Sequence, residues 1–274
     1  EKINYSQKIL FKAVNLVKRI KKPYFLWILL LDTHLPYLSP KKFRKYGSKF
    51  LPLILYLNWK ARRNGKYFRG ENIKFFKEFS QKEKLKLVGM YDDTIRYADE
   101  IIKELKSYLR DDDPIFIIHA DHGEGFGEHS FFYHPVMLYE ELIHVPLVIY
   151  NADVKGKVEE PFSLLNLAEM LRELINDKVD ASRIFSKIEQ KEWVISKVFG
   201  QKGTTEIISI RMKDWKFITG QKENDELYYL KKDPYEQENL IHEYPDLARD
   251  MKRFVEKILK REREIIRIKD KVKL

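Results

Sequence analysis

Apolar residues along the chain predict helices alternating with short buried strands. Residues 5–22 place apolar side chains at helical spacing, and Pro23 ends that helix. Residues 91–109 have the clearest helical period of the chain. Two wholly apolar runs, 24–31 and 115–118, follow these helices and are too short to be buried helices, which favours central parallel strands. This order predicts an α/β fold with a doubly wound, mostly parallel sheet.

Weaker patterns predict the remaining elements of this region. Apolar residues 50–59 indicate a helix that Asn64-Gly65 ends, and three consecutive aspartates at 111–113 indicate a solvated turn. The other segments expected to be regular are a helix at 71–88, a short helix at 137–143, a strand at 145–150 and a helix at 161–175.

From about residue 190 the pattern changes to short strands with polar turns. The strands expected there are 193–199, 206–211, 215–219 and 226–230, which together predict a small antiparallel sheet. Pro245 then begins a long helix. We therefore expect two parts. Residues 1–190 form the C-terminal portion of an α/β catalytic domain with a basic helical insertion at 41–88, and 191–274 form a small antiparallel-sheet subdomain with a C-terminal helix.

Composition narrows the function classes. The 274 residues carry a net charge of +10, and residues 41–88 alone hold 15 Lys/Arg against 3 Asp/Glu. That segment is either a patch that attracts polyanions or a solvated helical face, and the second reading is the more common one for such segments.

No sequence-specific nucleic-acid motif is recognised. No apolar run is long enough to span a membrane, and a cytoplasmic location is the default expectation. Cysteine is absent, which excludes disulfides and a cysteine nucleophile in these residues.

Candidate chemistry gathers after the strand at 115–118. Asp121 and His122 are followed by a glycine-rich loop that contains Glu124 and Glu128, and four of the seven histidines lie at positions 119, 122, 129 and 134. An adjacent Asp and His can supply one oxygen and one nitrogen ligand to a divalent cation. A nitrogen ligand favours Mn²⁺ or Zn²⁺ without excluding Ca²⁺ or Mg²⁺.

Five segments, taken in order, resemble the sulfatase branch of the alkaline phosphatase superfamily. The first is Asp-Thr-His-x-Pro-Tyr at 32–37, and the second is a helix with Tyr-Asp-x-x-Ile-x-Tyr-x-Asp at 91–99. The others are the Asp-His-Gly-Glu loop at 121–129, the His134 to Leu147 segment, and a C-terminal group at 213–240. Ala120 and Ser130 depart from the usual Ser and Gly, and neither is a presumed ligand.

The resemblance implies roles for five residues. Asp121 and His122 would be metal ligands, and His34 and His134 would be catalytic residues that also bind the sulfuryl oxygens or the leaving group. His129 would line the substrate pocket. A bound divalent metal (Ca, Mg, Mn or Zn) and a formylglycine nucleophile are the expected cofactors, and the substrate would be a small-molecule or glycan sulfate ester.

Other polar residues near these motifs have structural interpretations. We expect His119 to pack in the core and Asp32 to hold its turn or orient His34. We expect Asp92 and Asp99 to make structural hydrogen bonds. Glu124 and Glu128 are expected to shape their loop.

One family feature is not found. The usual paired acids and the Cys- or Ser-x-Pro-x-Arg motif do not occur in this sequence. We expect them in a missing N-terminal portion of the same protein, upstream of Glu1, and expect this chain alone to be inactive. Two alternatives stay open. One is a phosphodiester or phosphonate hydrolase, or a phosphoglycerol or phosphoethanolamine transferase, on the same scaffold. The other is a non-catalytic polyanion-binding protein.

Overall fold

The computed structural model describes residues 5–67, 79–151, 156–176, 192–199, 206–220 and 225–272. The chain forms two compact units. The first unit comprises Glu1–Phe116 and Glu124–Pro135, and the second comprises Ile117–Gly123 and Val136–Leu274. Among the described residues, no helix is both long enough and apolar enough to cross a lipid bilayer.

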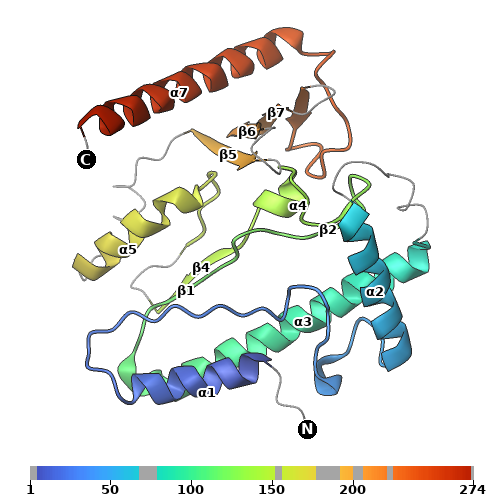
Figure 1. Cartoon of the computed structure of the whole chain (residues 1–274), viewed down its shortest axis with the longest axis vertical. Helices are drawn as coiled ribbons and strands as arrows, with labels where there is room; N and C mark the ends of the chain where they lie inside the picture. The colour runs from blue at the N-terminus through green and yellow to red at the C-terminus, as the bar shows by residue number, and fades with distance from the viewer. Residues whose placement is uncertain are drawn as a thin grey trace. The chain divides into compact units, whose positions relative to one another are not determined.

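Three helices dominate the first unit: α1 (Tyr5–Val17), α2 (Leu51–Tyr67) and α3 (Gln81–Tyr108). Helix α1 lies along α3 (Figure 1), and their apolar faces share a core that includes Leu10, Tyr97 and Ile101. Short 3₁₀ turns occur at Lys41–Phe43 (η1) and Arg110–Asp112 (η3).

The bounds of two helices differ from the sequence prediction. Helix α3 begins ten residues before the predicted start at 91, because Ser80 and Glu83 form a reciprocal capping box at its N-terminus. Helix α2 was expected to end at Asn64-Gly65 but continues to Tyr67, so that prediction was wrong. The predicted helix at 71–88 falls on α3 from Gln81 onward, and its residues 71–78 lie outside the described residues.

The predicted strand at 24–31 is wrong. The structure describes all eight residues and none of them belongs to a strand. Their side chains nevertheless alternate between partly buried and exposed, as they do in a strand. Tyr24, Leu26, Ile28 and Leu30 pack on the core between α1 and α3, while Phe25, Trp27, Leu29 and Leu31 are exposed. The apolar run indicates an extended segment, but a strand also requires a neighbour whose backbone groups pair with it.

Helix α3 also anchors the loop before α2. The buried Asp93 carboxylate accepts backbone N–H groups from Lys45, Tyr46 and Gly47 at 2.7–3.0 Å. Helix and loop approach so closely that a Cβ at Gly89 would lie 2.5 Å from the Tyr46 carbonyl oxygen. Only glycine permits that approach of one backbone to another.

A small antiparallel hairpin completes the first unit. Strands β2 (Gly125–Phe126) and β3 (Phe132–Tyr133) pair with Gly125 opposite Tyr133. Phe132 is buried in a second core with Tyr37, Leu57 and residues of α3. The hairpin thereby fixes the residues on either side of it.

The second unit contains the remaining predicted elements of the α/β region. Strands β1 (Phe116–His119) and β4 (Leu147–Tyr150) pair with each other and form a two-stranded sheet. Among the described residues, no further strand joins this sheet. The helical elements are α4 (Glu140–Ile143), η4 (Leu164–Asn166) and α5 (Leu167–Asn176). His119 was expected in the core, but it is exposed at the end of β1, so that prediction was wrong.

The C-terminal sheet confirms the predicted strands. Its antiparallel order is β5 (Trp193–Phe199), β6 (Glu206–Met212), β7 (Trp215–Thr219) and β8 (Glu226–Tyr229). Helix α7 (Pro245–Val272) covers one face, whose central row is Ile210, Phe217 and Leu227. Because side chains alternate along a strand, the neighbouring row of Arg211, Lys216 and Tyr228 faces the other way.

Candidate active site

Two histidines that are a hundred residues apart in sequence lie side by side in the first unit. His34 ends the turn after the extended segment, where its N–H donates to the Leu31 carbonyl. His134 directly follows β3. Their ring centroids are 5.6 Å apart and the rings are tilted by 57°. The structure therefore brings together the two residues that the sequence singled out as catalytic.

Each ring of this histidine pair has its Nδ1 engaged. His34 Nδ1 lies 2.7 Å from the Leu35 carbonyl oxygen, and His134 Nδ1 lies 2.9 Å from Glu124 Oε1. Both partners can only accept, so Nδ1 donates in each case. The other ring nitrogen, Nε2, is then the atom through which each imidazole can accept or deliver a proton.

Glu124 is the residue whose importance the sequence did not reveal. Its side chain is 5% exposed, and its second oxygen accepts the Tyr37 hydroxyl at 2.9 Å. Burial, followed by the charge of Glu124, raises the pKa of Tyr37 well above its usual range, so this phenol stays a donor. The aromatic rings of Tyr91 and Phe126 pack against Tyr37. Glu124 is thus held in a defined orientation toward His134.

Close packing and one side-chain hydrogen bond constrain the backbone of the loop around Glu124. A Cβ at Gly125 would lie inside contact distance of the Phe131 ring, and Gly127 has a φ of +100°. Glu128 accepts the N–H of Phe126, which agrees with the expected loop-shaping role. His129 stacks on Phe131 with 6.2 Å between the ring centroids. Two glycines and one carboxylate therefore fix the turn that presents Glu124.

Asp32 has a structural contact next to the histidine pair. Its carboxylate accepts a hydrogen bond from the Ser6 hydroxyl of α1. Burial raises the pKa of Asp32. This agrees with the interpretation that Asp32 holds the turn before His34.

Asp121 and His122 belong to the second unit and lie just after β1. Both side chains are exposed to solvent, at 81% and 42%, with His122 Nε2 4.0 Å from Asp121 Oδ1. His122 Nδ1 lies 2.8 Å from the Gly123 carbonyl and donates to it, which places the lone pair of the neutral ring on Nε2. Metal-binding histidines in general donate their other ring N–H in this way.

The donor set of this pair fits part of a divalent-metal site. One carboxylate oxygen and one imidazole nitrogen lie close enough for small side-chain rotations to bring both onto one ion. Among the described residues, no cluster of three or more His, Asp or Glu side chains could hold a metal. Further ligands are needed, and the expectation that this pair shares one site with His34 and His134 stays a prediction.

Comparison with known proteins places the chain in a family. The family model described as Sulfatase matches residues 2–176, well over half of the chain. The chain belongs to the sulfatase family.

Known relatives agree with this assignment. An arylsulfatase of Clostridium perfringens is 28% identical over 244 residues, which cover 81% of this chain and 50% of that protein. Arylsulfatase K of Danio rerio is 24% identical, over 66% of this chain and 39% of that protein. The chain spans about half the length, or less, of the curated relatives it matches.

Solved structures share the fold. The phosphonate monoester hydrolase of Agrobacterium radiobacter has a TM-score of 0.73 at 15% identity, covering 95% of this chain and 61% of that one. A structure in complex with D-glucosamine-2-N,6-O-disulfate has a TM-score of 0.65 at 17% identity, covering 96% and 71%. The chain therefore shares its fold with both of these structures.

Proposed function

We propose that the protein to which this chain belongs is a metal-dependent sulfuric-ester hydrolase. The observation that carries the proposal is the His34–His134 pair with its Glu124 support, within residues that match the sulfatase family. Sulfate-ester hydrolysis builds negative charge on the leaving oxygen and redistributes it over the sulfuryl oxygens. Two imidazoles side by side can neutralise that charge or protonate the leaving oxygen.

In the proposed mechanism, His134 contributes more to catalysis than His34. Its Nδ1–H donates to a buried carboxylate that Tyr37 also holds, so the ring keeps its orientation. Its Nε2 is then directed to donate toward an ester oxygen. His34 presents its Nε2 in the same way and binds the same group from the other side of the pair. His129 would line the pocket for the rest of the substrate.

Asp121 and His122 would supply two ligands of the divalent metal. When bound, the metal would act as a Lewis acid that withdraws charge from the ester oxygens. Ca²⁺, Mg²⁺, Mn²⁺ and Zn²⁺ all remain candidates for this mixed oxygen and nitrogen donor set.

The remaining parts of the proposal concern the whole protein. We propose that its nucleophile is a formylglycine outside these 274 residues, since the sequence has no cysteine and the relatives are about twice as long. We propose that β1 and β4 belong to a doubly wound, mostly parallel sheet, and that the catalytic domain of this chain extends to about residue 190. The substrate class is a sulfated small molecule or glycan, as the disulfated glucosamine bound by one structural neighbour suggests.

Turnover by the whole protein tests this proposal. We expect hydrolysis of 4-nitrophenyl sulfate that is lost after chelation and restored by one of the four cations. Asp121→Ala should abolish that metal-dependent turnover, with Asp99→Ala on the exposed face of α3 as the matched control. Undiminished activity of Asp121→Ala would rule out the metal role. Faster hydrolysis of a phenyl phosphonate monoester than of the sulfate would favour the second candidate, a phosphonate hydrolase of the kind that shares this fold.

A further inference from the structure

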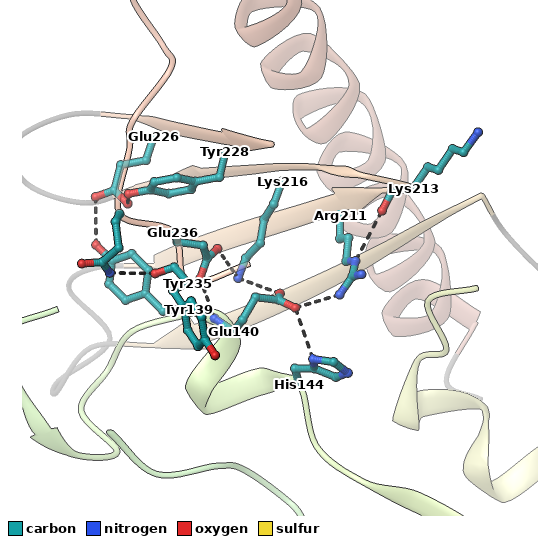
Figure 2. Close-up of polar contacts among 11 residues, drawn as sticks. Tyr139, Glu140, His144, Arg211, Lys213, Lys216, Glu226, Tyr228, Tyr235 and Glu236 are labelled. Carbon is teal, nitrogen blue, oxygen red and sulfur yellow. Dashed lines mark hydrogen bonds and ion pairs between the residues drawn. The ribbon is translucent and has the colours of Figure 1, made fainter. Parts of the chain in front are cut away.

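The second unit contains a buried ion cluster away from the proposed metal ligands. Lys216 of β7 is fully buried, and its Nζ lies 3.0 Å from Glu140 Oε1 and 2.7 Å from Glu236 Oε1. Arg211 of β6 contacts the other Glu140 oxygen at 2.7 Å. Two cations and two carboxylates thus balance each other between the small sheet and α4 (Figure 2).

This cluster fixes the start of α4. Glu236 Oε2 accepts the backbone N–H of Glu140 at 2.6 Å, which satisfies one of the free N–H groups at the first turn of the helix. The preceding residue, Tyr139, donates its hydroxyl to Glu226 of β8 at 3.1 Å. Helix α4 has only four residues, so its position depends on these contacts more than on its own hydrogen bonds.

Helix α4 in turn holds the loop of residues 121–123. The Gly123 N–H donates to the Leu142 carbonyl oxygen at 2.8 Å. A Cβ at Gly123 would overlap the Glu141 carbonyl oxygen, so the loop lies directly on the backbone of α4. Any shift of α4 must therefore move the residue next to His122.

We propose that Lys216, acting through Glu140 and α4, is a positioning residue for the loop that carries the proposed metal ligands. The inference rests on the metal role proposed above for Asp121 and His122. A buried lysine with two carboxylates resists displacement, because moving either acid away would leave charge without compensation in the interior. Solvent-exposed ligand side chains gain from such support, because the position of the backbone that carries them decides where they point.

Selective ¹⁵N-glycine labelling of the whole protein gives a direct measurement. The 274 residues contain 11 glycines, so they add few signals. Amide exchange at Gly123 reports the hydrogen bond to Leu142, and exchange at Gly220, which follows β7 and lies against the backbone of Glu206, reports that end of the small sheet. In Lys216→Met we expect Gly123 exchange to rise at least about tenfold relative to Gly220, and Mn²⁺ affinity to fall about 10- to 100-fold.

The matched control is Lys197→Met. Lys197 lies on β5 of the same sheet and pairs with Glu262 of α7, so the same substitution removes an ion pair without touching the contacts of α4 described above. Gly123 exchange should stay near the wild-type rate in this variant. If Lys216→Met does not fold, Glu140→Gln keeps the size and one acceptor oxygen of the side chain and should raise Gly123 exchange by a smaller factor.

The outcomes separate this inference from the proposed function. Gly123 exchange within twofold of wild type in the folded Lys216 or Glu140 variant would overturn the positioning role, whether or not Mn²⁺ binds. Equal acceleration at Gly123 and Gly220 would also overturn it, because Lys216 would then only stabilise the sheet. Faster Gly123 exchange in a protein whose wild type binds no Mn²⁺ would keep the mechanical link and reject the metal site.

Discussion

His134 donates its Nδ1 hydrogen to Glu124 over 2.9 Å, across the β2–β3 hairpin that separates the two residues in the chain. The same carboxylate accepts the Tyr37 hydroxyl. This arrangement makes Glu124 a positioning residue for the histidine that would face the ester. It also links the loop of Glu124 to the segment of His34, because Tyr37 lies three residues after His34.

Replacing Glu124 by Gln should lower kcat for an aryl sulfate more than it raises KM. The substitution keeps the shape of the side chain but removes the charged acceptor that orients His134 Nδ1. We expect kcat to fall about 10- to 100-fold, which is part of the rate enhancement that general acid–base catalysis contributes. Steady-state kinetics of the whole protein measure it, with Glu100→Gln, which removes a surface ion pair with Lys103 on α3, as the control that stays near wild type. A change confined to KM would contradict the positioning role.

Tyr37 should make the protein less stable at alkaline pH. Burial raises its pKa above the ordinary value of 10, so the phenol ionises in the unfolded chain before it does so in the folded one. Its contribution is fully present below pH 10 and is lost as the pH rises beyond it, by up to about 1.4 kcal/mol per pH unit. Urea unfolding between pH 8 and pH 11 should give a shallower decline for Tyr37→Phe than for wild type. Parallel declines would contradict this assignment.

Gly89→Ala should destabilise the first unit. The new methyl group would meet the Tyr46 carbonyl, a backbone atom that cannot rotate away. The cost of overpacking, about 1–3 kcal/mol, exceeds the gain of about 1 kcal/mol in helix propensity. Denaturant unfolding measures the difference, and Ser107→Ala on the exposed side of α3 should stay within about 0.5 kcal/mol of wild type. A Gly89→Ala protein of unchanged stability would show that the loop can move aside.

Lys216→Met should lower the free energy of unfolding by about 3–5 kcal/mol at neutral pH, because it leaves two buried carboxylates with one cation fewer. Lys197→Met removes a partly exposed pair and should cost at most about 1 kcal/mol.

The loss in Lys216→Met should also depend on pH. Burial raises the pKa of Glu236, and the charge of Lys216 opposes that rise. Without the lysine the folded-state pKa rises further above the unfolded value, so stability is retained at low pH and lost as the pH rises through the folded-state pKa. The loss should therefore be smaller at pH 5 than at pH 8. Equal losses at both values would contradict an uncompensated buried acid.

Local sequence signals were sufficient for most elements. The strands of the C-terminal sheet were predicted almost to the residue, because alternation and turn residues are visible within seven-residue windows. The early start of α3 was missed, although Ser80 and Glu83 have the spacing of a capping box. The prediction failed where pairing matters: the segment 24–31 has the apolar composition of a strand, and no local pattern shows whether a neighbour pairs with it.

By itself the sequence determined the family, the helical periods and the residue types that can do the chemistry: His34, His134, Asp121 and His122. Only the tertiary structure decided how they are supported. Glu124 looked like a loop residue until Tyr37 and His134 were seen on its two oxygens. No local pattern in the sequence marks Lys216 as a buried residue, and its position between two carboxylates is a result of the fold. Periodicity depends on neighbours in the chain, whereas the charge balance of a buried group depends on partners as many as 76 residues away, which only packing brings together.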